Sequence, residues 1–432
     1  MRKRSRSVLL ALLAALALVV AACSPDDAGD TTTTGASADT TEAPTDTTEA
    51  PVDTTEPAPA EPIKIGMLAD QTSTFTPWGV NVRDGMLLAA EEINAAGGVD
   101  GRMIEIVQQD SENDPDVAAT AWDRLIEEGV VAVGGILSSG VAPTAGQLAE
   151  ADQVPVFFVK AGTPVALTQD SRYTFRTCLP AAPSDAAPVL QYAQEQGLST
   201  VGVIVADYAW GQGFKAAVET TFEGSGIDYG EIQVAPVPPD TDFTPFVRAM
   251  ADAGAEMVIA TGHPPGGAAI VGLSADLIGD VPVTGAWTPP DRSLALIDPA
   301  TAIGRFTDFA CADYTSAGYA DLAARYLAYS DNAFMSDDAV AGFGIVTMVA
   351  EAVGAVGDDP VAVAEYLHAN EFDLEGYAYT MSWTEWGEQA AAQPIFFGIT
   401  EGPAPEGLNE AGDWWIEVLS QSDPLDPYVP ES

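Results

Sequence analysis

The sequence has few of the residues that usually hold metals and little positive charge. Three cysteines and two histidines occur in 432 residues, and none of their spacings is typical of a zinc site. Lys and Arg together number 16, against 64 Asp and Glu, so the net charge is −48. Nucleic acid and anionic membrane surfaces are therefore not expected as partners, and neither a metal nor a cofactor is expected.

No apolar run closes the chain, and nothing in that part suggests a membrane-crossing receptor. At the other end, four basic residues precede the apolar run Val8–Val20, which is short for a membrane span and typical of a secretory signal. The motif Val20-Ala21-Ala22-Cys23 resembles the bacterial lipobox, in which the cysteine is lipidated and begins the mature chain. We therefore expect a lipoprotein signal peptide over residues 1–22, with an ordinary signal peptide as the alternative.

A polar segment follows Cys23. Residues 24–61 are mostly Thr, Ala, Asp, Glu and Pro, and such a composition buries too little apolar surface to offset the entropy of ordering. We interpret residues 23–61 as a disordered tether between a lipid anchor and a folded body. The protein is then exported and anchored at the outer face of the cytoplasmic membrane.

From residue 62 onward, short β-rich runs alternate with helical patterns. The runs "IKIGMLA", "MIEIVQQD", "VVAVGGI" and "VPVFFV" form one series, and a second series begins with "VGVIVA" after residues 173–176. Near-continuous apolar strands alternating with helices indicate parallel sheets covered on both faces. The pattern predicts an α/β protein with two Rossmann-like lobes, followed by helices over 319–330 and 338–356 and a β-rich tail.

Polar and aromatic residues collect in the loops that follow these strands. Ligands of open parallel sheets lie at the carboxyl ends of the strands, so we take these residues as candidates for ligand binding. Ser138 and Ser139 are expected at a helix start, where hydroxyl and amide groups can hold a carboxylate, and indole faces can stack on rings or attract ammonium groups. Each Trp could instead pack the lobes together and each Ser could cap a helix. The candidates are Trp78, Ser138, Ser139, Ala161, Thr163, Trp210, His263 and Trp287.

Several stretches together resemble the periplasmic solute-binding proteins of branched-chain amino acid ABC transporters, the Leu/Ile/Val-binding type. The resemblance extends from Ile63 to about Leu419. It rests on "IKIGMLADQTS", "GVNVRDGMLLAAEEINAAGGVDGRMIEIVQQDSENDP", "GGILSSGVA", "VPVFFVKAGTPVALT", "YTFRTCLPAAPSDAAPVLQYA" and "TDFTPFVRAMADAGAEMVIATG", which occur in the family's order.

The resemblance implies a type I periplasmic-binding fold, with a three-strand hinge joining the two lobes and a small-molecule ligand clamped between them. It also implies a monomer that delivers its ligand to an ABC permease in the membrane. The expected division is lobe 1 over 62–178 and 311–396, lobe 2 over 179–310 and 397–420, and a tail over 421–432.

The same resemblance assigns roles to the candidate residues. The family's first aromatic wall falls on Trp78, its carboxylate-binding serine on Ser138 or Ser139, and its ammonium-facing carbonyl and hydroxyl on Ala161 and Thr163. Two aromatic contacts of the second lobe fall on Trp210 and His263. The acidic residue that holds the ligand ammonium in amino acid binders falls on Trp287.

The tryptophan at position 287 affects the expected ligand class. Without an acid at this position, the ammonium group of an amino acid ligand would lose a charge-assisted hydrogen bond, which costs about 1.5–3 kcal/mol. Contact of the ammonium group with an indole face would recover only about 0.5–2 kcal/mol. A standard branched-chain amino acid is therefore not the first expectation. An aromatic carboxylate, an amide or a quaternary amine fits the indole surfaces better.

The resemblance also places Cys178 in the first crossover between the lobes and Cys311 in the second. These hinge strands run side by side in such proteins, which implies a Cys178–Cys311 disulfide, with two unpaired buried thiols as the alternative.

Two other functions remain open from the sequence. A ligand sensor for a signalling partner would use the same two-lobed clamp. A nucleotide-dependent enzyme has one weak feature, "GQGFKA" at 211–216, which lies five residues past its strand and lacks the acidic residue expected after the next strand. No catalytic residues are assigned, and we do not expect an enzyme.

Overall fold

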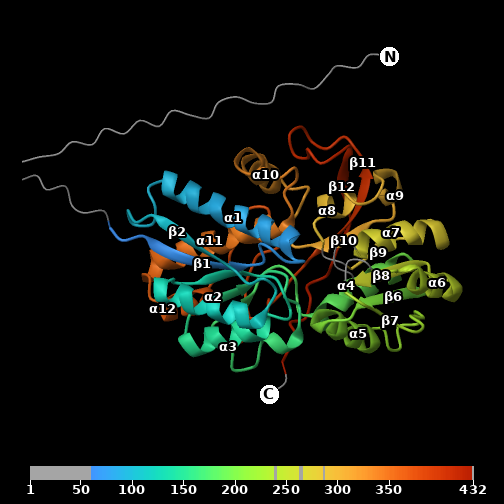
Figure 1. The fold of residues 1–432 in the computed structure, drawn as a ribbon, viewed down its shortest axis with the longest axis horizontal. Helices are drawn as coiled ribbons and strands as arrows, with labels where there is room; N and C mark the ends of the chain where they lie inside the picture. Colours follow the sequence, from blue (N-terminus) through green and yellow to red (C-terminus); the bar gives the residue numbers. More distant parts are fainter. Residues whose placement is uncertain (1–59, 238–240, 262–265, 286–287, 431–432) are drawn as a thin grey trace, which may run out of the picture. The chain divides into compact units, whose positions relative to one another are not determined.

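The computed structural model describes residues 60–237, 241–261, 266–285 and 288–430 (Figure 1). The expected signal segment, Cys23 and almost all of the tether lie outside the described residues. His263 and Trp287 also lie outside them.

Lobe 1 is built on a five-stranded parallel sheet of order β2-β1-β3-β4-β5. Strand β1, which lies between β2 and β3, is buried because almost every residue of "IKIGMLA" is apolar. Gly66 lies opposite Val107 on one side and Val133 on the other, which sets the register of three strands. The strands are β1 (Ile63–Ala69), β2 (Ile104–Asp110), β3 (Val133–Ile136), β4 (Val156–Phe158) and β5 (Thr174–Arg176).

Lobe 2 contains a four-stranded parallel sheet of order β7-β6-β8-β9 and a three-stranded antiparallel sheet of order β10-β11-β12. A parallel bridge between Val283 and Phe306 connects the two sheets. The strands are β6 (Val201–Ala206), β7 (Gln233–Ala235), β8 (Met257–Thr261), β9 (Val283–Thr284), β10 (Thr307–Ala310), β11 (Ile395–Glu401) and β12 (Trp414–Gln421). The two parallel series confirm the predicted α/β architecture.

Helices cover the sheets, and local sequence signals fix several of their ends. Asp114 caps α2 by accepting from the backbone N–H groups of Asp116 and Val117, and Gly129 ends it in the left-handed conformation with φ of 76°. The helices of the sheet layers are α1 (Thr76–Ala95), α2 (Pro115–Glu128), α3 (Ala142–Asp152), α4 (Ala182–Glu195), α5 (Ala209–Thr221), α6 (Thr244–Ala253), α7 (Gly266–Leu277), α8 (Pro290–Leu294) and α9 (Pro299–Ala302), with a 3-10 turn over Pro164–Ala166.

Three helices lie between β10 and β11 in sequence. The patterns expected over 319–330 and 338–356 are α10 (Ala317–Tyr329) and α11 (Asp337–Val356), and α12 is Pro360–Ala369. Among the described residues, α11 alone is long and apolar enough to cross a membrane, and most of it is buried inside the protein. It packs on α1 at very close range, because a β-carbon on Gly342 would lie 2.3 Å from the Val82 carbonyl oxygen. These contacts identify α11 as a core helix of lobe 1.

A disulfide joins two of the segments that pass between the lobes. Cys178 lies between β5 and α4, Cys311 follows β10, and their Cα atoms are 5.2 Å apart. The Gln389 side chain, from the segment that leads back to β11, donates to the Cys178 carbonyl oxygen at 3.4 Å. The pairing that the resemblance implied is therefore present, and a third chain passage lies beside it.

The C-terminal segment after β12 runs along both lobes without forming a regular element. Ser422 and Leu425 donate backbone hydrogen bonds to the carbonyl oxygens of Pro394 (3.1 Å) and Ala392 (2.9 Å). Beyond this point, the carbonyl oxygens of Asp426, Tyr428 and Pro430 each accept from a side chain of the folded body.

Candidate functional site

The loops after β3 and β4 hold the expected hydroxyl groups next to each other. Ser138 donates to Asn113 Oδ1 at 2.5 Å and accepts from the Gly140 N–H at 3.1 Å, while Ser139 Oγ accepts from the Thr163 N–H at 3.2 Å. All three hydroxyl-bearing residues are buried. Because β1 and β3 are neighbours at the point where the strand order reverses, these loops lie where open parallel sheets bind ligands.

The expectation that Ser138 and Ser139 lie at a helix start needs correction. Helix α3 begins at Ala142, and its N-cap position is Val141. The two serines instead form the turn before the helix, where the Ser138 carbonyl oxygen accepts from the N–H groups of Val141 (3.1 Å) and Ala142 (2.9 Å). Ser138 thus stabilises the turn, and Ser139 connects the turn to the loop over residues 161–163.

A buried ion pair holds the loop over residues 161–163. The Arg176 guanidinium donates to the carbonyl oxygens of Ala161 and Thr163 and pairs with the Glu388 carboxylate at 2.9 Å. Burial raises the pKa of the Glu388 carboxyl group, and the charge of Arg176 partly opposes this change. The Ala161 carbonyl oxygen, which the resemblance directs at a ligand, therefore already accepts a hydrogen bond from the protein, although a carbonyl oxygen can accept two.

The two described tryptophans among the candidates are both buried at helix starts. Trp78 packs on Phe75 at the beginning of α1, with ring centroids 5.3 Å apart. Trp210 lies at the beginning of α5 in lobe 2 and contacts Gly162 of lobe 1, because a β-carbon added to Gly162 would lie 2.4 Å from Trp210 Nε1. The structure thus brings Ser139, Thr163 and Trp210 together around Gly162.

One donor of this group has no partner. Trp210 Nε1 is buried, and no described residue accepts its hydrogen bond. An unsatisfied buried donor costs about 1–3 kcal/mol, so its position at a contact between lobes indicates a site where another molecule can supply the acceptor.

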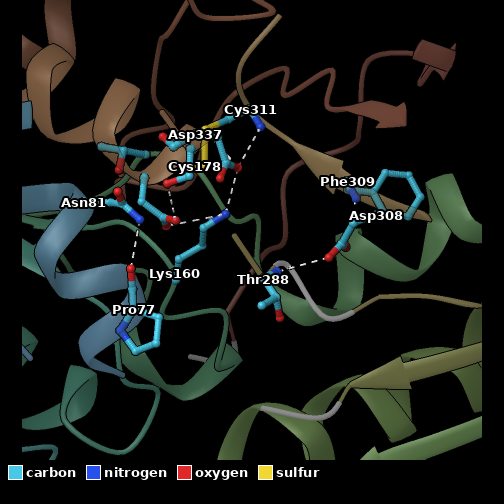
Figure 2. A network of polar contacts seen from close by, with 12 residues as sticks. Pro77, Asn81, Lys160, Cys178, Thr288, Asp308, Phe309, Cys311 and Asp337 are labelled. Atoms are coloured by element: carbon cyan, nitrogen blue, oxygen red, sulfur yellow. Dashed lines mark hydrogen bonds and ion pairs between the residues drawn. A yellow bond between two sulfur atoms is a disulfide. The ribbon is translucent and has the colours of Figure 1, made fainter. Parts of the chain in front are cut away.

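A buried charge cluster lies beside the disulfide, and the sequence-based candidates did not include it. The Lys160 ammonium contacts the Asp337 carboxylate at 2.8 Å and the Asp338 carboxylate at 3.8 Å (Figure 2). Burial lowers the pKa of Lys160, but the charges of Asp337, Asp338 and Asp308 outweigh it and raise the pKa above its ordinary value. The same Asp337 oxygen lies 3.3 Å from the Cys311 N–H, so one carboxylate links the lysine to the second crossover.

Lobe 2 contributes a second acidic group near this cluster. Asp308 accepts from the backbone N–H groups of Thr288 (3.0 Å) and Phe309 (2.9 Å), as Figure 2 shows. Asp291, four residues after Trp287 in sequence, pairs through Oδ2 with its neighbour Arg292 at 3.2 Å, while its buried Oδ1 has no hydrogen-bond partner in the part of the chain that the structure describes. Burial raises the pKa of Asp291 to about 6.

A chain of polar side chains connects this loop to lobe 1. Arg292 donates to Asn332 Oδ1 at 2.9 Å, Asn332 Nδ2 donates to the Tyr326 hydroxyl at 2.7 Å, and Tyr326 donates to Asn81 Oδ1 at 2.9 Å. Asn81 in turn donates to the Pro77 carbonyl oxygen at 2.9 Å, next to Trp78 (Figure 2). Helix α8 is therefore connected to the start of α1 indirectly, through one buried and three partly buried hydrogen bonds.

Two sequence signals could have revealed the charged residues. Lys160 directly follows the buried apolar run "VPVFFV", where a lysine needs a partner, and Asp337-Asp338 opens a long apolar helix that has no other acid in its first half. Their pairing is not readable from the sequence, because 177 positions separate Lys160 from Asp337.

The comparisons with known proteins agree with this architecture. Residues 62–398 match a family described as periplasmic binding protein. A leucine-, isoleucine-, valine-, threonine- and alanine-binding protein of Pseudomonas aeruginosa is 27% identical over 208 residues, which are 48% of this chain and 55% of that relative. The matched region thus covers about half the length of this curated relative.

Solved structures show the same fold at low identity. A solute-binding protein of an ABC transporter from R. palustris, in complex with benzoate, superposes with a TM-score of 0.70 at 18% identity. The match covers 85% of this chain and 98% of the R. palustris chain. A periplasmic binding protein from Burkholderia mallei has a TM-score of 0.73 and 17% identity, with 84% and 95% covered. Both are described as binding proteins, and neither is described as an enzyme. The chain therefore belongs to the periplasmic binding protein family and has the type I fold of ABC-transporter solute-binding proteins.

Proposed function

We propose that this protein is an extracytoplasmic substrate-binding lipoprotein, anchored through lipid on Cys23, that delivers a small molecule to an ABC permease. The basic and apolar N-terminal segment, the lipobox-like motif and the polar tether support the anchored form. The family supports the role in solute binding.

The ligand's head is proposed to be an oxygen acceptor such as a carboxylate. The observation that carries this is the pair of unused donors beside Gly162: Trp210 Nε1–H from lobe 2, and the Ser139 hydroxyl, whose proton has no acceptor among the described residues. Hydrogen bonds from such neutral donors to a carboxylate are strong in a buried site. A small separation of Trp210 from Gly162 would give the head access to both donors.

The ligand's body is proposed to be flat and apolar. Trp78 and Trp210 offer buried indole surfaces, and Trp287 stands in sequence where the related amino acid binders have an acid. These features favour an aromatic carboxylate, an amide or a quaternary amine. Benzoate, which is bound in one of the structural neighbours, is an aromatic carboxylate and belongs to the first of these classes.

An amino acid is the second candidate, and one specific observation favours it. Asp291 lies in α8, four positions after Trp287 in sequence, and its buried Oδ1 has no hydrogen-bond partner among the described residues, so this oxygen could accept a hydrogen bond from a ligand ammonium group. The curated relative from Pseudomonas aeruginosa is named as an amino acid binder.

Calorimetry with matched probes tests the ligand class. We expect benzoate to bind, benzamide to bind more weakly, and leucine to bind no more tightly than 4-methylpentanoate, which is leucine without its amine. Tight leucine binding with no response to the other classes would contradict the first candidate and support the second. Trp287→Ala should weaken the bound probe by at least about 2 kcal/mol with little change in melting temperature.

Transport and sensing differ in their partner. Delivery to a permease predicts that the ligand-bound protein stimulates ATP hydrolysis by a permease–ATPase complex reconstituted from neighbouring genes. If it instead changes the activity of a neighbouring sensor kinase, the protein is a ligand sensor.

A further inference from the structure

The C-terminal segment carries a proline at every third position. Its sequence, "SDPLDPYVP" over residues 422–430, contains Pro424, Pro427 and Pro430. This spacing favours an extended, three-residue-per-turn backbone that forms no internal hydrogen bonds and leaves its carbonyl oxygens free to accept from other groups. Such a segment loses little conformational entropy when it is held in place.

One half of the segment is attached to lobe 2. The Ser184 hydroxyl, in the first turn of α4, donates to the Asp426 carbonyl oxygen at 2.9 Å. On the same helix, Gln191 Oε1 accepts from the Asp423 N–H at 3.3 Å. Helix α4 packs on α5 and therefore moves with lobe 2.

The other half is attached to lobe 1. The Trp386 indole donates to the Tyr428 carbonyl oxygen at 3.0 Å, and the Gln169 side chain donates to the Pro430 carbonyl oxygen at 2.7 Å. Gln169 lies in the loop before β5, and Trp386 packs on the core of lobe 1. An indole N–H bonded to a carbonyl oxygen of a proline-rich segment is the mode by which aromatic grooves recognise such peptides.

The connection between the two attachments is short. Asp426 is bonded to lobe 2 and Tyr428 to lobe 1, so only Pro427 separates the two anchor residues, and positions two apart along a chain are at most about 7 Å from each other. On the lobe 2 side, a cavity of about 410 Å³ lies between α4 and the segment, lined by Pro183, Ala187 and Gln191 among others. The segment is thus held at defined points and is not packed along its whole length.

From these contacts we infer that residues 422–430 form a strap that links lobe 1 to lobe 2 and limits how far the lobes separate. Opening that moves Ser184 away from Trp386 must break an anchor, because the single residue between Asp426 and Tyr428 provides no slack. The strap therefore favours partly closed conformations of the ligand-free protein. It is distinct from the three chain passages of the hinge, and its role does not depend on which ligand is bound.

Distance measurements on the ligand-free protein test the strap. Spin labels attached through unnatural amino acids at the exposed positions Asp123 on α2 and Glu223 after α5 report the separation of the lobes. In a Gln169→Ala/Trp386→Phe variant, which loses both side-chain anchors to lobe 1 and keeps the backbone bonds of Ser422 and Leu425 to residues 392–394, we expect a longer mean distance and a broader distribution. A chain ending at Gln421 should show a larger shift in the same direction.

A matched control is Gln212→Ala, which removes an exposed glutamine side chain of α5 far from the strap in sequence. It should reproduce the distances of the unmodified protein. The double anchor variant keeps Leu425 and the whole segment, so it reports on the strap even if the shortened chain does not fold. If the double variant has a native circular dichroism spectrum and an unchanged distance distribution, the strap does not limit opening and the inference is wrong.

Discussion

The Trp210 indole occupies the position where a side chain of residue 162 would begin. A β-carbon on Gly162 would lie 2.4 Å from Trp210 Nε1 and 2.5 Å from Cδ1. Gly162→Ala should therefore push Trp210 away and destabilise the protein by about 1–3 kcal/mol, as overpacked sites do. Thermal melting of the ligand-free protein measures this. The control Gly272→Ala, on α7, has a single neighbour at 4.0 Å and should be neutral or slightly stabilising.

Trp210→Phe removes the indole N–H and keeps an aromatic ring at this position. Because the buried N–H has no partner in the described residues, its removal should offset part of the free energy that the ligand-free protein loses when the smaller ring leaves a cavity. Binding of benzoate should weaken by about 1.5–3 kcal/mol if this N–H donates to the carboxylate. Calorimetry and melting curves on the same samples test both effects. Equal benzoate affinities in the two proteins would exclude Trp210 as a donor.

Removal of one partner from the buried Lys160–Asp337 pair should be costly. Lys160→Met leaves the Asp337 carboxylate buried beside Asp338, and an uncompensated buried charge costs about 3–5 kcal/mol. Lys160→Met/Asp337→Leu should recover much of this loss, because an apolar pair of similar size needs no charge compensation. Denaturant unfolding gives the three free energies. A double variant that is as unstable as the sum of the two single variants would show that the residues act independently.

The stability of the protein should depend on pH through Asp291. Burial raises the pKa of this group from 3.8 to about 6 in the folded protein, so the folded state binds a proton that the unfolded state has released. The contribution of Asp291 to stability is therefore complete below about pH 4 and is lost as the pH rises to about 6, by about 3 kcal/mol. Asp291→Asn cannot titrate, so the free energy of unfolding of the variant minus that of the unmodified protein should increase across this range. A difference that stays constant from pH 4 to pH 6 would contradict a raised pKa of the buried Asp291 carboxyl group.

Loss of the disulfide should lower stability substantially. It closes a loop of 133 residues, for which the chain-entropy model gives about 5 kcal/mol, and measured values are commonly about 2–4 kcal/mol. Cys178→Ser/Cys311→Ser should therefore unfold at clearly lower denaturant concentration. The reduced form of the unmodified protein is the matched comparison, since it should lose a similar free energy. An unchanged midpoint in both samples would show that the bond contributes nothing to stability.

The sequence was sufficient to predict the alternation of strands and helices, because buried parallel strands are almost wholly apolar and their helices keep one apolar face. It was less informative at α4, where Pro183 and Pro188 interrupt the helical pattern although Pro188 lies inside the helix. The serine turn before α3 was also misplaced. There the first helical residue is preceded by Val141, which has no capping side chain, and the turn depends on backbone bonds to Ser138.

The sequence likewise predicts some residues of the candidate site and not others. Hydroxyl and aromatic residues at strand ends are visible in the sequence because the fold class states where ligands bind, and the structure brings Ser139, Thr163 and Trp210 together around Gly162. The Lys160–Asp337 and Arg176–Glu388 pairs could not be predicted, because each joins residues far apart along the chain. Asp337 and Glu388 meet Lys160 and Arg176 only because the chain folds back to lobe 1 after the second crossover.

The disulfide has a topological consequence as well as an energetic one. Cys178 and Cys311 stand at the two ends of the stretch that forms the parallel sheet of lobe 2, so residues 179–310 emerge from and return to a single covalent junction. A protease cut in any surface loop of this stretch would leave both fragments attached to each other. The stretch also has the properties of an exchangeable cassette: its ends are adjacent, and a homologous segment with cysteines at the same two positions could be transplanted to alter ligand preference while lobe 1 is retained.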